Sequence, residues 1–241
     1  MNFVYTALIF FVASAVQGAI GFGAGPVVLA FLPLMVGYSK AIAINTFVMI
    51  WATIFLSVKC RKNIPWKILL PILIPSVIIA GLAAYFSISV SSDLMMIMLG
   101  FVLIVLAIWF LIFAEKIKIK PNVINGSVMG VLTGLMSGLF AIGGPTAALY
   151  LLPATDDKDQ YFASIQVLFA LCNTVTLTVR ICCGLLAFDD INYLAVGLVS
   201  VLVGSIAGRK VFRKLDKSIF EKLVYLYIGI NGLWIIISRL F

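Results

Sequence analysis

Two glycine-rich stretches interrupt runs of apolar residues that are long enough to enter a bilayer. They are Gly-Phe-Gly-Ala-Gly-Pro at 21–26 and Ala-Ile-Gly-Gly-Pro at 141–145, and each ends in Gly-Pro. Proline holds φ near helical values and lacks an N–H, so it suits the first turn of a new helix. The glycines before it permit positive φ and leave backbone N–H groups uncovered. Each stretch therefore predicts that one helix ends and another begins inside an apolar region.

The composition places these breaks in a membrane protein. Of the 241 residues, 63% are hydrophobic and 11% are charged, whereas a soluble domain is nearer half apolar and a quarter charged. The apolar runs between the charge clusters are about 18 to 22 residues long, the length that spans a hydrocarbon core as a helix. The sequence predicts an all-α polytopic membrane protein.

Several other classes fit the sequence poorly. The net charge of +8 does not indicate nucleic-acid binding, because the basic residues flank apolar spans, where Lys and Arg set topology. With no histidine and no Cys-x-x-Cys, we expect four free thiols, no metal and no cofactor. Residues 1–18 lack the positive start of a signal peptide, so we expect a retained span.

The apolar segments have the same order in both halves of the chain. The expected segments are 3–20, 26–37, 41–58, 68–86 and 94–113, followed by 123–140, 146–152, 161–186, 191–207 and 219–238. Gly25-Pro26 matches Gly144-Pro145 at an offset of 119, and Trp109 matches Trp234 at an offset of 125. We expect two transmembrane repeats, 1–120 and 121–241, that form one transport domain together.

The charges of the loops favour one orientation of these repeats. If each broken pair crossed the membrane once, the basic residues would divide about evenly, against the positive-inside rule. If each pair enters and leaves on one side, fourteen Lys and Arg residues are cytoplasmic and three, Lys40, Arg180 and Arg239, lie outside. Each half then has a broken or re-entrant pair plus three spans, eight or more membrane segments in all. The halves are inverted, and both termini lie outside.

The chemistry of the breaks suits an anion. A helix N-terminus carries roughly half a positive charge and free N–H donors, and the helices opening at Pro26 and Pro145 would direct them at the glycines. Each Asp and Glu lies in an expected loop or at the end of an expected span, as Glu221 does, which disfavours a proton relay through carboxylates. The alternative reading of the glycines is tight helix packing.

Polar residues near the breaks complete the candidate site. Gln17 precedes the first break by one turn, and Asn45 and Gln166 occupy corresponding places in the two halves. Each of them alone could instead form hydrogen bonds between helices. We expect Arg180 to extend to the outer surface, with attraction of anions at the outer mouth as the alternative. The candidate substrate-binding residues are Gln17, Gly21, Gly23, Gly25, Asn45, Ser137, Gly143, Gly144, Thr146 and Gln166.

At these residues the chain resembles the sulfite exporter TauE/SafE family, also called the 4-toluene sulfonate uptake permease family. The resemblance rests on residues 17–26 with Leu32-Pro33, and on residues 137–145 with Leu152-Pro153. It implies transport of sulfite, sulfonates, sulfoacetate or related anions across the bacterial inner membrane. Ala24 stands where a glycine is common, and Phe140-Ala141 shortens the second glycine run.

The leading hypothesis is a secondary transporter or exporter of small sulfur-containing anions, with membrane lipid around it and a homodimer left open. The alternatives are a transporter of another solute, such as a carboxylate or a cation, and a membrane partner subunit that does not transport. An intramembrane enzyme is disfavoured, because the chain lacks histidines, intramembrane acids and a nucleophile motif. We therefore assign no catalytic residue.

Overall fold

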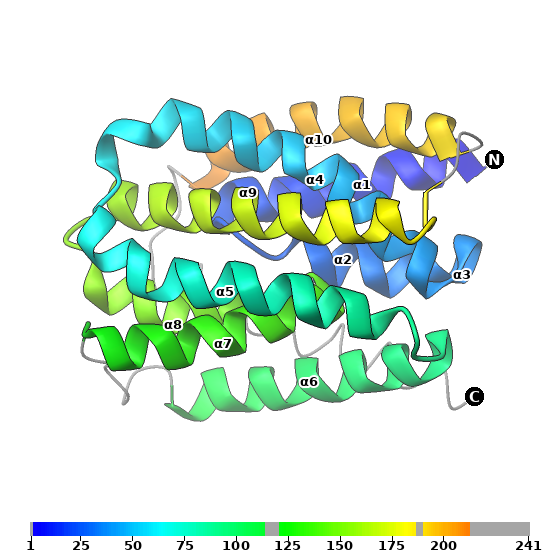
Figure 1. Cartoon of the computed structure of the whole chain (residues 1–241). Coiled ribbons are helices and arrows are strands. Elements are labelled where there is room, and N and C mark those ends of the chain that lie inside the picture. The colour runs from blue at the N-terminus through cyan, green and yellow to red at the C-terminus, as the bar shows by residue number, and fades with distance from the viewer. Residues whose placement is uncertain (1, 114–120, 187–189, 213–241) are drawn as a thin grey trace.

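The computed structural model describes residues 2–113, 121–186 and 190–212. In this part of the chain the structure is helical and contains no strand (Figure 1), as predicted. The α-helices are α1 (Asn2–Ile20), α2 (Ala24–Phe31), α3 (Pro33–Val36), α4 (Tyr38–Cys60), α5 (Trp66–Ser87), α6 (Ser92–Phe113), α7 (Val123–Phe140), α8 (Gly144–Ala154), α9 (Lys158–Cys182) and α10 (Ile191–Phe212).

Helix length and surface both match a multi-pass membrane protein. Five helices, α4, α5, α7, α9 and α10, are long and apolar enough to cross a membrane, and α1 and α6 contain the shorter apolar stretches Phe3–Ala19 and Ser92–Val105. Large apolar side chains such as Trp51, Ile74 and Phe101 are exposed on the outside, which a lipid environment favours. The expected span at 219–238 lies outside the described residues.

The short arms after the breaks differ from the expectation in their bounds. The arm expected at 26–37 is two helices, because Pro33 has no N–H to continue the ladder of α2. α8 begins at Gly144, two residues before the expected arm. The span expected to reach residue 186 ends at Cys182, since Gly184 has a φ of 74° that closes the helix.

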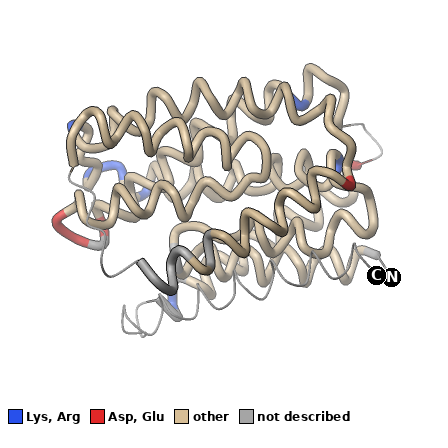
Figure 2. Tube along the Cα trace, turned by 90° about the horizontal axis from the view of Figure 1, so that it is seen from below, with Lys and Arg blue, Asp and Glu red and all other residues tan. Residues whose placement is uncertain are grey.

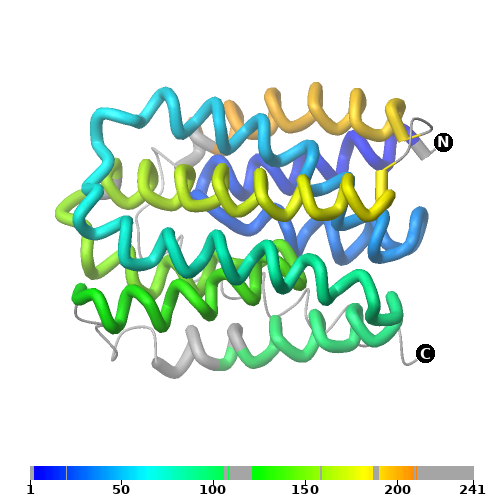
Figure 3. The backbone as a smooth tube through the Cα atoms, viewed as in Figure 1, coloured from blue at the N-terminus to red at the C-terminus, as the bar shows by residue number. Residues whose placement is uncertain are grey.

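Each broken pair of helices forms a hairpin that starts and finishes at one end of the bundle (Figure 3). α1 runs inward from the end that carries the N-terminal residues, and α2 and α3 lead back to that end. α7 runs inward from the opposite end, and α8 returns there. The two breaks therefore lie in the interior of the bundle.

Closely packed helix pairs hold these hairpins. α7 carries glycine at every fourth position from Gly126 to Gly138, and a Cβ on Gly130 would lie 2.6 Å from the carbonyl oxygen of Ile72 in α5. Glycines of α10 lie equally close to the backbone of α1. Small residues at such spacing let membrane helices approach closely. α1 therefore packs along α10 and α7 along α5, while α4 packs on α9 between them.

Charged residues gather toward the ends of the bundle (Figure 2). Lys59, Arg61 and Lys62 are exposed where α4 ends. At the other end, Lys40 forms an ion pair with the buried carboxylate of Asp190 at 2.8 Å. Arg180 is the exception described below.

Candidate functional site

The first break reverses the chain within three residues. α1 ends at Ile20, and α2 begins at Ala24 with Pro26 in its first turn. Gly21 and Gly23 have φ values of 90° and 104°, a region that side chains disfavour and glycine adopts freely. The predicted helix break is present, and these glycines are needed for their backbone conformation.

The second break makes the same reversal with a different backbone. α7 ends at Phe140, and Ala141 follows with a φ of 55°, the one positive φ outside glycine in the described residues. The Ala141 N–H donates to the carbonyl oxygen of Ser137 at 3.0 Å. Pro145 then lies in the first turn of α8, where its missing N–H costs nothing.

The two breaks pack directly against each other. A Cβ on Gly25 would overlap the carbonyl oxygen of Ala141, and a Cβ on Gly144 would overlap the side chain of Phe22. Glycine at both positions is therefore required by close approach. The sequence left open whether the breaks meet, and the tertiary structure brings them into contact.

A small cavity lies where the breaks meet. Its volume is about 40 Å³, whereas a single water needs about 10–15 Å³ on the same measure. The residues that line it are Gln17, Phe22, Gly23, Ala24, Gly25, Pro26, Asn45, Met49, Ser137, Ala141, Ile142, Gly144, Pro145, Phe169 and Asn173. The first turns of both α2 and α8 thus face one space, with N–H groups that have no partner inside their own helices.

Six of the ten predicted site residues line this cavity, and four do not. The six are Gln17, Gly23, Gly25, Asn45, Ser137 and Gly144. The other four, Gly21, Gly143, Thr146 and Gln166, lie in or against the breaks without lining the space.

Two of these four side chains hold the backbone of the breaks. The Gln166 side-chain amide donates to the carbonyl oxygen of Gly21 at 3.1 Å. The Thr146 hydroxyl donates to the carbonyl oxygen of Gly143 at 2.9 Å and accepts from the Thr133 hydroxyl at 3.1 Å.

Among the described residues, four buried side-chain atoms of polar residues have no hydrogen-bond partner, and two of them belong to the cavity lining. They are Asn45 Oδ1, Ser137 Oγ, Gln166 Oε1 and Arg180 Nε. Buried polar groups in folded proteins almost always have a hydrogen-bond partner. Asn45 and Ser137 line the cavity itself, so their unpartnered atoms are available to bind a polar ligand there.

The expectation that Arg180 extends to the outer surface is wrong. Its side chain is 1% exposed. Nη1 donates to the Thr46 hydroxyl at 2.8 Å, and Nη2 donates to the carbonyl oxygen of Gly138 at 2.7 Å. Gly138 lies in the last turn of α7, where carbonyls lack helical partners and carry partial negative charge. The end of α7 therefore draws the guanidinium inward.

Nine cavity residues were not among the candidates. Six of them belong to the two breaks themselves, and the other three are Met49, Phe169 and Asn173. Gln166, Asn173 and Arg180 follow one another at intervals of seven residues on α9. Residues seven apart in a helix share a face, so this spacing was the available signal that Asn173 faces the breaks. Met49 and Phe169 are apolar residues in apolar spans, and nothing local distinguishes them.

The fold and the site together define a class of protein. A helical membrane protein whose broken helices meet at an interior cavity has the design of a membrane transporter. Irregular backbone at membrane depth is tolerated where protein or a cavity surrounds it, and both breaks meet this condition.

Comparison with protein families agrees with that class. The family model of the sulfite exporter TauE/SafE matches residues 6–235, nearly the whole chain, so the chain belongs to this family. Membership implies a membrane transporter. Searches of curated proteins and of solved structures found no match.

Proposed function

We propose that this protein is a secondary transporter or exporter of small sulfur-containing anions such as sulfite, bound between the N-termini of α2 and α8. The observation that carries the proposal is that both helix N-termini line one buried cavity. Two opposed N-termini supply N–H donors and partial positive charge from both sides. None of the described residues that line the cavity is acidic, so nothing there repels an anion.

The size of the cavity supports a compact substrate. A volume of about 40 Å³ has room for about three waters, which is comparable to the four non-hydrogen atoms of sulfite. An aromatic sulfonate is much larger and would require the breaks to separate. The conformation described here therefore favours sulfite over bulky organosulfonates.

We also propose that residues 1–120 and 121–241 are inverted repeats of one transport domain. Helix partners are exchanged between the halves, since α1 packs on α10 of the second half and α7 on α5 of the first. The breaks contact each other reciprocally, Gly25 with Ala141 and Gly144 with Phe22. An offset of 119 residues takes Gly25 to Gly144 and Phe22 to Ala141, so each contact is the counterpart of the other. A two-fold axis between the breaks would require this relation.

In this proposal the protein lies in a bacterial inner membrane with both termini outside. The exposed basic residues where α4 ends and α5 begins then face the cytoplasm, as the positive-inside rule requires. Fusion of a reporter to the C-terminus tests the orientation, and a cytoplasmic signal contradicts it.

Flux through purified protein tests the function. Proteoliposomes are expected to take up labelled sulfite, and unlabelled acetate in excess is expected to compete poorly. Gly144→Val is expected to abolish uptake, because its side chain would occupy the place of Phe22. Thr178→Ala is the control, since Thr178 is exposed on α9 and lines neither pocket. Acetate uptake without sulfite uptake would identify a carboxylate transporter instead.

A further inference from the structure

We infer that Arg180 supplies the fixed positive charge that the substrate anion binds, and that this charge makes the site prefer anions over neutral molecules of the same shape. This inference rests on the proposed function and adds to it the residue that selects for charge. The helix N-termini contribute partial charges, whereas Arg180 contributes a whole one.

The charge of Arg180 is buried, and no acidic side chain among the described residues forms an ion pair with it. Its two hydrogen bonds go to neutral oxygens of Thr46 and Gly138, and Nε has no partner. The ion pair recorded among the described residues joins Lys40 to Asp190 and does not involve Arg180. Burial of a charge is costly unless an opposite charge accompanies it. An anion that binds nearby would remove that cost, so the unbalanced charge favours its binding.

The guanidinium binds residues that are next in the chain to residues of the cavity lining. Each of its hydrogen-bond partners is the chain neighbour of a lining residue, because Thr46 follows Asn45 and Gly138 follows Ser137. On α9, Arg180 shares a face with Asn173, which also lines the cavity. In a low-dielectric interior, a full charge interacts with an ion strongly even beyond hydrogen-bond distance.

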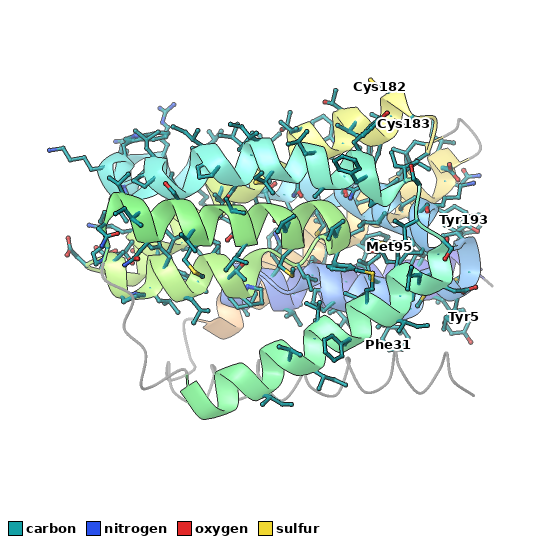
Figure 4. All side chains as sticks on the ribbon, turned by 60° about the horizontal axis from the view of Figure 1, so that its bottom comes forward. Tyr5, Phe31, Met95, Cys182, Cys183 and Tyr193 are labelled. Atoms are coloured by element: carbon teal, nitrogen blue, oxygen red, sulfur yellow. The ribbon has the colours of Figure 1, made fainter. Side chains whose placement is uncertain are left out.

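Arg180 also lies between the cavity and a second pocket near the end of α9. That pocket has a volume of about 340 Å³, and its lining includes Gly184, Leu185 and the ion pair of Lys40 with Asp190. The exposed Cys182 and Cys183 at the same end of α9 are labelled in Figure 4. In chain order, Asn173 at the cavity comes first, Arg180 in the last turn of α9 next, and Leu185 of the outer pocket just after the helix.

A purely structural role does not require the charge. A neutral amide also has donors for the Thr46 hydroxyl and for the Gly138 carbonyl. Under the proposed repeats, the counterpart of Arg180 is Lys59, which is exposed where α4 ends. The buried position of the charge is thus specific to the second half, beside the second break.

The test compares two probes of equal size that differ in charge, methanesulfonate and dimethyl sulfone. Binding of each to purified full-length protein in nanodiscs is followed by thermal shift. The wild-type protein is expected to bind methanesulfonate at least about tenfold more tightly, the effect of one favourable charge contact. In R180Q this preference is expected to fall to about one. R180K keeps the charge and is expected to retain the preference within about threefold, and K59Q, which loses an exposed charge, is expected to match the wild type.

Two results would overturn the inference. The first is an unchanged preference in R180Q. The second is equal loss of affinity for both probes, which a merely structural role would produce. If R180Q does not yield folded protein, R180K is the deciding variant. It keeps the positive charge, so loss of the preference for methanesulfonate in R180K would contradict the inference. Failure of the proposed function is recognised separately, since it appears as absence of sulfite flux in wild-type proteoliposomes.

Discussion

The two breaks make the same reversal of the chain but are held in different ways. At the first break, the neutral amide of Gln166 donates to the carbonyl oxygen of Gly21. At the second, the guanidinium of Arg180 donates to the carbonyl oxygen of Gly138. Both side chains come from one face of α9, fourteen residues apart. One helix thus supports both breaks, and it places a full charge beside only the second.

The two breaks also differ in the residues that adopt a positive φ. The first uses two glycines with positive φ, Gly21 and Gly23, whereas the second uses Ala141 in a left-handed conformation. Equivalent Gly-Pro sequences therefore produce a similar turn with different local strain. The comparison teaches that sequence likeness between the halves predicts the turn but not its electrostatic surroundings.

The largest expected effect comes from filling the contact between the breaks. Gly25→Val and Gly144→Val place side chains where Ala141 and Phe22 lie, and overpacking of this kind costs about 1–3 kcal/mol or more. We expect both variants to lose sulfite uptake and to lower the melting temperature. Retained uptake in either one would show that the breaks do not need to touch.

The second-largest effect compares Arg180, the charged side chain that holds the second break, with Gln166, the neutral side chain that holds the first. Arg180→Gln is expected to reduce sulfite uptake at low concentration by about ten- to a hundredfold, since a charged hydrogen bond contributes about 1.5–3 kcal/mol. Gln166→Leu removes one neutral hydrogen bond, about 0.5–1.5 kcal/mol, and is expected to reduce uptake less. Uptake rates measured side by side at equal protein content check this order. A larger loss in Gln166→Leu would mean that the position of the first break matters more than charge.

A smaller effect is expected from the unpaired polar atoms of the cavity. Ser137→Ala removes a hydroxyl that has no partner in the protein, so protein stability should change little. If Ser137 Oγ donates to the substrate, the KM for sulfite should rise about two- to tenfold, the value of one hydrogen bond. Concentration-dependent uptake measures the KM, and the Thr178→Ala variant on the exposed surface of α9 is the control. An unchanged KM would exclude Ser137 from binding.

The smallest effect concerns the strained backbone of the second break. Ala141→Gly should relieve the left-handed conformation, which costs about 1–2 kcal/mol for a residue with a side chain, partly offset by the greater freedom of glycine when unfolded. We expect a rise of a few tenths of a kcal/mol or more in stability, seen as a slightly higher melting temperature. Gly23→Ala is expected to shift it the opposite way, and equal shifts would contradict the difference between the breaks.

The sequence by itself determined the elements of this protein. Apolar runs of spanning length predict membrane helices because lipid requires them, and Gly-Pro ends a helix and starts another through local backbone chemistry. The family likewise follows from the sequence, since its model matches residues 6–235. The position of the breaks between α1 and α2, and between α7 and α8, needed no tertiary information.

Only the tertiary structure decided how these elements meet. In spans that are apolar on every face, the sequence does not specify which face packs inward, so it did not show that Gly25 contacts Ala141 or that Phe169 lines the cavity. For Arg180 the usual preference of a cation near a span end is the surface. The carbonyls at the end of α7 reverse that preference, because they offer the guanidinium partners inside the bundle.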